Sequence, residues 1–175
     1  MAIAILSNLC LSRLILELGS TDLFGGNSIL IGLIPYLIPM AFAPMIVMIS
    51  VGPRMAALSA LMTSVFHATM QNAGIEALAI SLGSALVGAY FCREIRHRGS
   101  ALKAGAMAGL TGSLLALGIG FASGGAGVAS VNHALASLLM GVFTGGLVLT
   151  AMPLIEHGFK VATDATLFEL TDFNH

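Results

Sequence analysis

The chain has 175 residues, of which 57% are hydrophobic and only 9% are charged, whereas a soluble globular domain usually carries about 25% charged residues. The mean hydropathy is +0.98, and the chain contains 21 glycines and no tryptophan. This composition predicts one polytopic membrane domain whose helices pack through small residues. The net charge of −1 and the scattered Lys and Arg residues exclude a nucleic-acid-binding surface.

Six apolar runs have the length of membrane helices, which need about 20 residues to cross about 30 Å of hydrocarbon. We therefore predict an all-α bundle of about six transmembrane helices, at residues 2–18, 28–50, 53–70, 75–91, 101–122 and 133–155. Short polar or glycine-rich segments separate them, at residues 19–27, 51–52, 71–74, 92–100 and 123–132. Because these connections are short, neighbouring helices should be antiparallel. The transmembrane domain thus covers 1–155, and 156–175 form a polar tail.

Most positive charges fall on one side of the predicted membrane. Six of the seven Lys and Arg residues lie in or beside the connections that follow the even-numbered runs: Arg54, Arg93, Arg96, Arg98, Lys103 and Lys160. The opposite connections carry Asp22 and Glu76. Since Lys and Arg collect in cytoplasmic loops, this pattern predicts that both chain ends are cytoplasmic.

Arg13 is the exception, because it lies inside the first run with Glu17 four residues later. At this spacing the two side chains can pair on one helical face. One interpretation is an interfacial pair that reaches the headgroup region. The other is an intramembrane pair in a substrate path or proton relay, because charges within the membrane often mark function.

The second run contains Pro35, Pro39 and Pro44. Each proline removes a backbone donor, so this helix is predicted to be kinked or locally unwound. A structural kink is one interpretation and a transporter-type binding site is another, although the latter calls for a matching interruption elsewhere in the chain. Three GxxxG patterns predict close helix packing, at Gly105 with Gly109, Gly120 with Gly124, and Gly141 with Gly145.

No catalytic motif is recognisable in the sequence. HExxH and GxSxG motifs are absent, so we expect no enzyme activity, cofactor or metal site on this chain. A site shared by His67, His133 and Glu76 is geometrically conceivable, and isolated interfacial histidines are the alternative. Cys10 and Cys92 fall at different expected depths in the membrane, so a disulfide is not predicted.

The polar tail has the features of a docking segment. Thr166 and Glu169 have the spacing of a capping box, which predicts the start of a short cytoplasmic helix. Its apolar residues have too few neighbours to build a core and therefore call for a partner domain: Leu167, Phe168, Leu170 and Phe173.

The stretch from Met152, MPLIEHGFKVATDATLFELTDFNH, resembles the segment by which bacterial seven-transmembrane receptors with an intracellular HD-type phosphohydrolase pass from their last membrane helix into the hydrolase. The family pattern reads approximately L-P-x-x-E-x-x-F-x-x-x-T-D and then L-L-E-L-S-D-x-N-H-P. The matching residues are Pro153, Glu156, Phe159, Thr163, Asp164, Leu167, Glu169, Leu170, Asp172, Asn174 and His175. Phe168 and Thr171 depart from the pattern, and PYLIPMAFAPM, VGPR and the RxxRxR loop are also similar.

The resemblance implies more than this chain contains. Members have an extracellular sensor domain, seven membrane helices and a cytoplasmic HD domain that binds two divalent metal ions and hydrolyses cyclic di-AMP. Six crossings would correspond to helices two to seven, so we expect a fragment without the sensor and HD domains. His175 belongs to the linker pattern and receives no metal role. The expected location is the bacterial inner membrane. The expected partners are lipid and the HD domain, and the resemblance leaves open whether the chain also forms a homo-oligomer.

Three functional hypotheses follow. The leading one is a transmembrane anchor and signal relay, in which a coupling linker passes movement of the last helix to the hydrolase: Pro153, Glu156, Phe159, Thr163, Asp164, Thr166, Leu167, Glu169, Leu170 and Asp172. The second is a small transporter or channel that uses the proline-rich helix and the Arg13–Glu17 pair. The third is a structural membrane subunit that docks a separate protein through its tail.

Overall fold

The computed structural model describes residues 1–20, 32–72, 74–94, 99–124 and 127–159, and these residues form helices without any strand. The prediction of an all-α bundle is confirmed. The elements in chain order are α1 (Ala2–Ser20), η2 (Ile34–Leu37), α3 (Phe42–Ser50), α4 (Pro53–Met70), α5 (Ile75–Phe91), η3 (Cys92–Glu94), α6 (Gly99–Ala122) and α7 (Gly127–Phe159).

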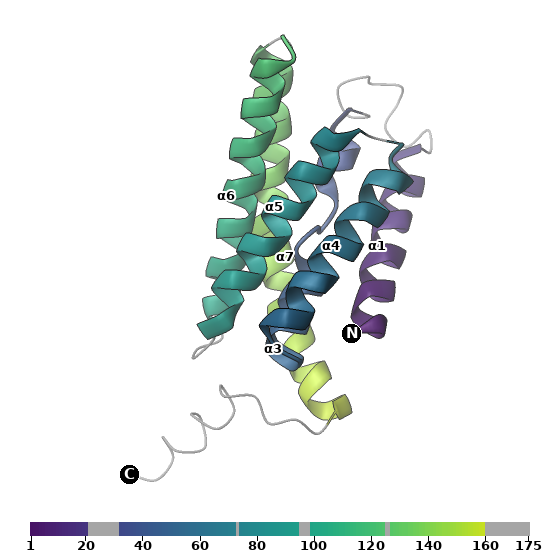
Figure 1. Cartoon of the computed structure of the whole chain (residues 1–175), viewed down its shortest axis with the longest axis vertical. Coiled ribbons are helices and arrows are strands. Elements are labelled where there is room, and N and C mark those ends of the chain that lie inside the picture. The colour runs from purple at the N-terminus through teal and green to yellow at the C-terminus, as the bar shows by residue number, and fades with distance from the viewer. Residues whose placement is uncertain (21–31, 73, 95–98, 125–126, 160–175) are drawn as a thin grey trace.

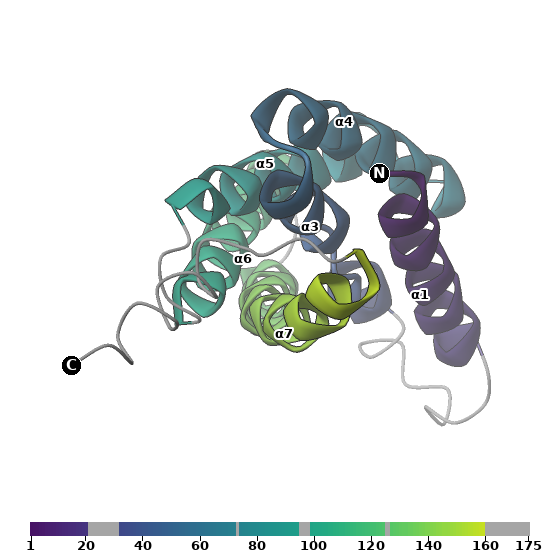
Figure 2. The ribbon, with the colours of Figure 1, turned by 90° about the horizontal axis from the view of Figure 1, so that it is seen from below.

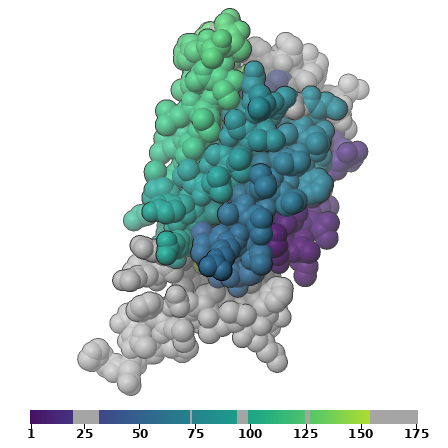
Figure 3. All heavy atoms as spheres, in the orientation of Figure 1, coloured from purple at the N-terminus to yellow at the C-terminus, as the bar shows by residue number. Residues whose placement is uncertain are grey.

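The long helices run side by side along the long axis of the molecule (Figure 1). Seen along that axis, α3 lies among the other helices, with α4 and α5 on one side, α6 and α7 on another, and α1 at the edge (Figure 2). Figure 3 shows α4, α5 and α6 covering one broad face, with α1 beside them. The second apolar run is therefore the internal element of the bundle.

The surface of the bundle carries many large apolar side chains, and small residues are common in its interior. Leu114 on α6 and Leu139 on α7 are 67% and 68% exposed, whereas many buried positions carry Ala, Ser or Thr. This distribution suits a lipid environment, where small and hydroxyl-bearing residues pack helices together. Within the described residues, α1, α6 and α7 are long and apolar enough to cross a membrane, and the segments Ile34–Ser50 and Ile75–Phe91 are shorter apolar helices.

Helices α6 and α7 touch through their backbones. A Cβ atom on Gly105 would lie 2.5 Å from the carbonyl oxygen of Gly141 and from the Cα of Gly145. A Cβ on Gly109 would lie 2.7 Å from the carbonyl oxygen of Leu138. The close packing predicted from these two GxxxG patterns is confirmed.

The third GxxxG pattern behaves differently. Gly120 packs against the side chain of Ser130, but Gly124 has no atom within 4 Å of its Cβ position and a φ of +69°. This left-handed conformation favours glycine, and it occurs in the turn after α6 ends at Ala122. The predicted packing role is therefore wrong for Gly124, which terminates a helix instead.

Helix α7 is longer than the predicted run 133–155. It begins at Gly127 and continues to Phe159, so residues 127–132 are helical and not part of a loop. The polar residues Ser130 and Asn132 had favoured a loop in this stretch. Ser130 is buried against Gly120 of α6, and this packing extends the helix by almost two turns.

The predicted interruption of the second run is confirmed. η2 ends at Leu37, α3 begins at Phe42, and Ile38 between them has an extended conformation with ψ of 133°. Pro39 and Pro44 are both fully buried and cannot donate backbone hydrogen bonds. We call residues 38–41 the helix break. Non-helical backbone at membrane depth is tolerated where protein surrounds it, as it does here.

Candidate functional site

Helix α7 connects the two ends of the bundle. It has 33 residues and extends along the molecule beside α6 (Figure 1). Pro153 lies inside it and is exposed; because proline has no N–H, the helix lacks one backbone hydrogen bond at this point. The first predicted linker residues, Pro153, Glu156 and Phe159, lie in α7. The others lie outside the described residues: Thr163, Asp164, Thr166, Leu167, Glu169, Leu170 and Asp172.

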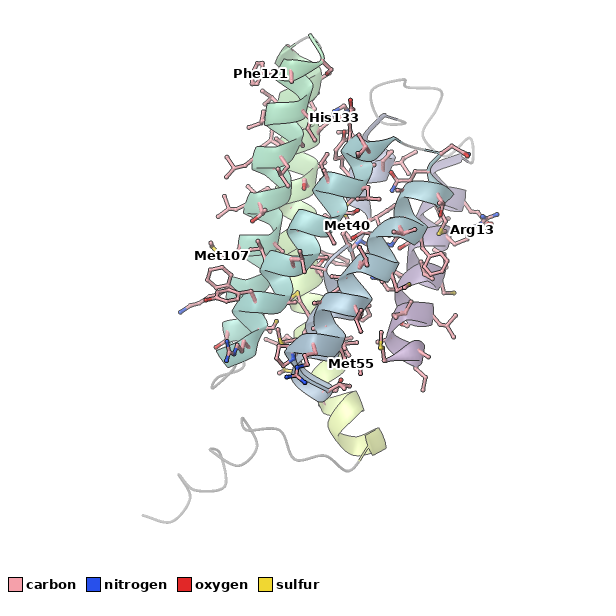
Figure 4. The ribbon with its side chains drawn as sticks, in the orientation of Figure 1. Arg13, Met40, Met55, Met107, Phe121 and His133 are labelled. Carbon is pink, nitrogen blue, oxygen red and sulfur yellow. The ribbon has the colours of Figure 1, made fainter. Side chains whose placement is uncertain are left out.

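Three of the four positive side chains on the described residues lie at the end of the bundle where α7 finishes, and Arg13 on α1 is the exception (Figure 4). Arg54 lies in the first turn of α4, Arg93 in η3 and Lys103 near the start of α6, and all three are exposed. These helix ends lie at the same end of the molecule as the start of α1 (Figure 1). Glu76 lies in the first turn of α5, which begins at the opposite end. The charge asymmetry predicted from the sequence is therefore present in three dimensions.

A buried polar cluster fastens α1 to α4. The Ser12 hydroxyl donates to the carbonyl oxygen of Asn8 at 2.7 Å, and its oxygen lies 2.9 Å from Nε2 of His67. Asn8 and Ser12 are fully buried and His67 is 2% exposed. Asn8 Nδ2 and His67 Nδ1 have no partner among the described residues. We call these three residues the α1–α4 polar cluster. Sequence reasoning missed it, although the spacing of Asn8 and Ser12 by four residues in an apolar helix was a usable signal.

His133 makes a different contact. Its ring stacks on Tyr36 of η2 with centroids 4.4 Å apart and an interplanar angle of 13°. This contact links η2, the first half of the broken helix, to α7. His67 is engaged with α1 instead, so the two histidines do not form the conceivable shared site with Glu76. Within the described part of the chain, no group of three metal-ligating side chains occurs.

Arg13 and Glu17 form the ion pair that their spacing predicted. Arg13 Nε lies 3.1 Å from Glu17 Oε1, and the side chains are 66% and 69% exposed. Figure 4 shows Arg13 directed away from the bundle. The exposure and direction of the pair favour the interfacial interpretation over a buried relay. Cys10 and Cys92 are both free, so the structure contains no disulfide between them.

An apolar exterior, glycine-mediated helix contacts and a broken internal helix define a multi-pass helical membrane protein. The family model described as "7TM receptor with intracellular HD hydrolase" matches residues 1–163. The chain therefore belongs to this family, as its tail residues had indicated. No curated protein and no solved structure matches it.

Proposed function

We propose that this chain is the anchoring and signal-relay region of a membrane-bound HD-family phosphohydrolase whose substrate is a cyclic dinucleotide, cyclic di-AMP. Catalysis and its divalent metal ions belong to the HD domain, and this chain contributes no catalytic residue. The observation that carries the proposal is the continuity of α7, which runs the length of the bundle and continues to Phe159, within the family match.

The orientation follows from charge. The ends of α4, α5 and α6 that carry Arg54, Arg93 and Lys103 lie beside the end of α7. Positive residues are retained in the cytoplasm, so this end of the bundle faces the cytoplasm of a bacterial cell and delivers α7 to the hydrolase. Reporter fusions after His175 test this placement, and an extracytoplasmic reporter would refute it.

The relay operates through a change in the position or rotation of α7. An outside signal biases two packing states of the bundle, and α7 carries the difference to the hydrolase through the coupling linker. Because α6 contacts α7 backbone to backbone, the two helices move as a pair. The relay therefore needs no catalytic group within the membrane.

Alanine insertions after Phe159 test the relay in the receptor that contains its HD domain. One inserted residue rotates the following chain by about 100°, whereas seven residues add length but restore the phase to within about 20°. The measurement is hydrolysis of cyclic di-AMP by receptor in native membrane vesicles. We expect one residue to change the activity at least severalfold and seven to change it little. Equal activity of both variants would contradict relay by helix rotation.

Solute flux through liposomes containing only this chain would instead favour the transporter hypothesis.

A further inference from the structure

A small cavity lies against the helix break, inside the bundle. Its volume is about 20 Å³, and it is lined by the break together with residues of α5, α6 and α7. Figure 4 places Met40, which belongs to the break, near the middle of the bundle. A space of this size holds about one water molecule when two to four polar groups surround it.

The polar lining of the cavity includes a buried hydroxyl without a partner. Ser84 of α5 is 5% exposed, and its Oγ has no hydrogen-bond partner among the described residues. A Cβ on Gly112 would lie 2.6 Å from this oxygen and closer still to the Oγ of Ser137. The hydroxyls of Ser84 and Ser137, from α5 and α7, therefore both approach Gly112 of α6 beside the cavity.

Thr144 and Met40 also line the cavity. The hydroxyl of Thr144 donates its proton to the carbonyl of Met140 at 2.7 Å, so its oxygen can still accept. The carbonyl of Met40 receives no hydrogen bond from the residue four positions later, because that residue is Pro44. An occupant that accepts a hydrogen bond from the Ser84 hydroxyl and can itself donate would suit this polar lining.

We propose that this cavity is a binding site for a single internal water molecule, which satisfies Ser84 and bridges α5, α7 and the helix break. The described residues that line the cavity carry no charge. A bare cation would therefore lose its hydration without a compensating carboxylate. An unpartnered hydroxyl within the membrane domain is also costly. A water molecule is neutral, so the site needs no carboxylate, and it can accept the hydrogen bond of the Ser84 hydroxyl.

The site has a mechanical consequence, and this consequence alone rests on the proposed relay function. A water-mediated hydrogen bond at the break can be exchanged as the two half-helices change their angle. Tyr36 on η2 stacks against His133 of α7, so bending at the break would be coupled to α7. The binding of water at this site does not depend on the proposed relay function.

The test compares Ser84→Ala with Ser59→Ala in the purified whole chain. Ser59 is a matched control because it is also a fully buried helical serine, but its hydroxyl donates to the Ala56 carbonyl at 2.8 Å. If water is bound, Ser84→Ala removes hydrogen bonds and lowers the melting temperature by about 2–4 °C relative to the control. If the cavity is dry, the same change removes an unsatisfied hydroxyl, and an equal or higher melting temperature overturns the proposal.

Two measurements on the unsubstituted chain complete the test. A high-resolution crystal structure should show density for one water molecule at about 2.7–3.2 Å from Ser84 Oγ, and the lack of such density overturns the proposal. Melting temperatures should be the same in sodium, potassium and choline chloride. Stabilisation by sodium that disappears in Ser84→Ala would identify a cation as the occupant and would also overturn it. Neither measurement depends on hydrolysis, so failure of this proposal and failure of the relay are distinguishable.

Discussion

The contact between α6 and α7 can be tested by adding one methyl group at Gly141. A Cβ at this position would overlap the Gly109 backbone and lie 2.7 Å from the Gly105 carbonyl oxygen. These are backbone atoms, so relief requires the helices to move apart, and overpacking of this kind costs about 1–3 kcal/mol. Gly146 on the same helix has no atom within 4 Å of its Cβ position, and there alanine should add about 0.5–1 kcal/mol through helix propensity.

The expected difference between Gly141→Ala and Gly146→Ala is therefore about 1.5–4 kcal/mol, or about 3–16 °C in melting temperature. Thermal unfolding can be followed with a thiol-reactive fluorophore in a Cys10→Ser background. Cys92 is 2% exposed and reacts when the bundle opens. Equal melting temperatures for the two alanine variants would refute the backbone contact between α6 and α7.

Three other predictions concern polar side chains and the buried thiol. A double-mutant cycle with Ser12→Ala and His67→Ala should give a coupling free energy of about 0.6–1.7 kcal/mol, and additive effects would contradict the α1–α4 polar cluster. Burial raises the pKa of the Cys92 thiol to about 12, so alkylation of the folded chain at about pH 8 should be at least about a hundredfold slower than after unfolding in detergent; similar rates would contradict its burial. Glu17→Gln should change the free energy of unfolding by less than about 1 kcal/mol, because its partner Arg13 is also exposed, and a larger loss would indicate a buried role.

The sequence predicted well those features that depend on local pattern. Proline spacing located the interruption between η2 and α3, and glycine spacing located the contact of Gly105 and Gly109 with α7. The same glycine rule failed at Gly124, because a GxxxG pattern cannot distinguish a glycine in a helix contact from one that ends the helix with positive φ. Residues 127–132 were missed for a similar reason, since the packing of Ser130 is decided by another helix.

The family could be recognised from the tail, whereas the family model matches the membrane region and ends at residue 163. The tail stretch and the family match share residues 152–163, and the match also covers the similar membrane segments PYLIPMAFAPM, VGPR and RxxRxR. Only the α1 side of the α1–α4 polar cluster could be predicted from the sequence, because Ser12 and His67 are 55 residues apart. Asn8 and Ser12 mark a polar face on α1, but no local rule identifies the helix that covers it.

The helices of the bundle differ in how firmly they are joined, and this difference constrains any relay. α6 and α7 contact each other through backbone atoms, so we expect rotation of one to displace the other. α1 is the outlying helix, with 17% of residues 2–19 buried, and the hydrogen bond between Ser12 and His67 joins it to α4. Both η2 and α3 contact α1 and α7. A displacement of α1 would therefore reach α7 most directly through the two halves of the broken helix. Such a movement would bend the chain at residues 38–41, where helical backbone bonds are already missing.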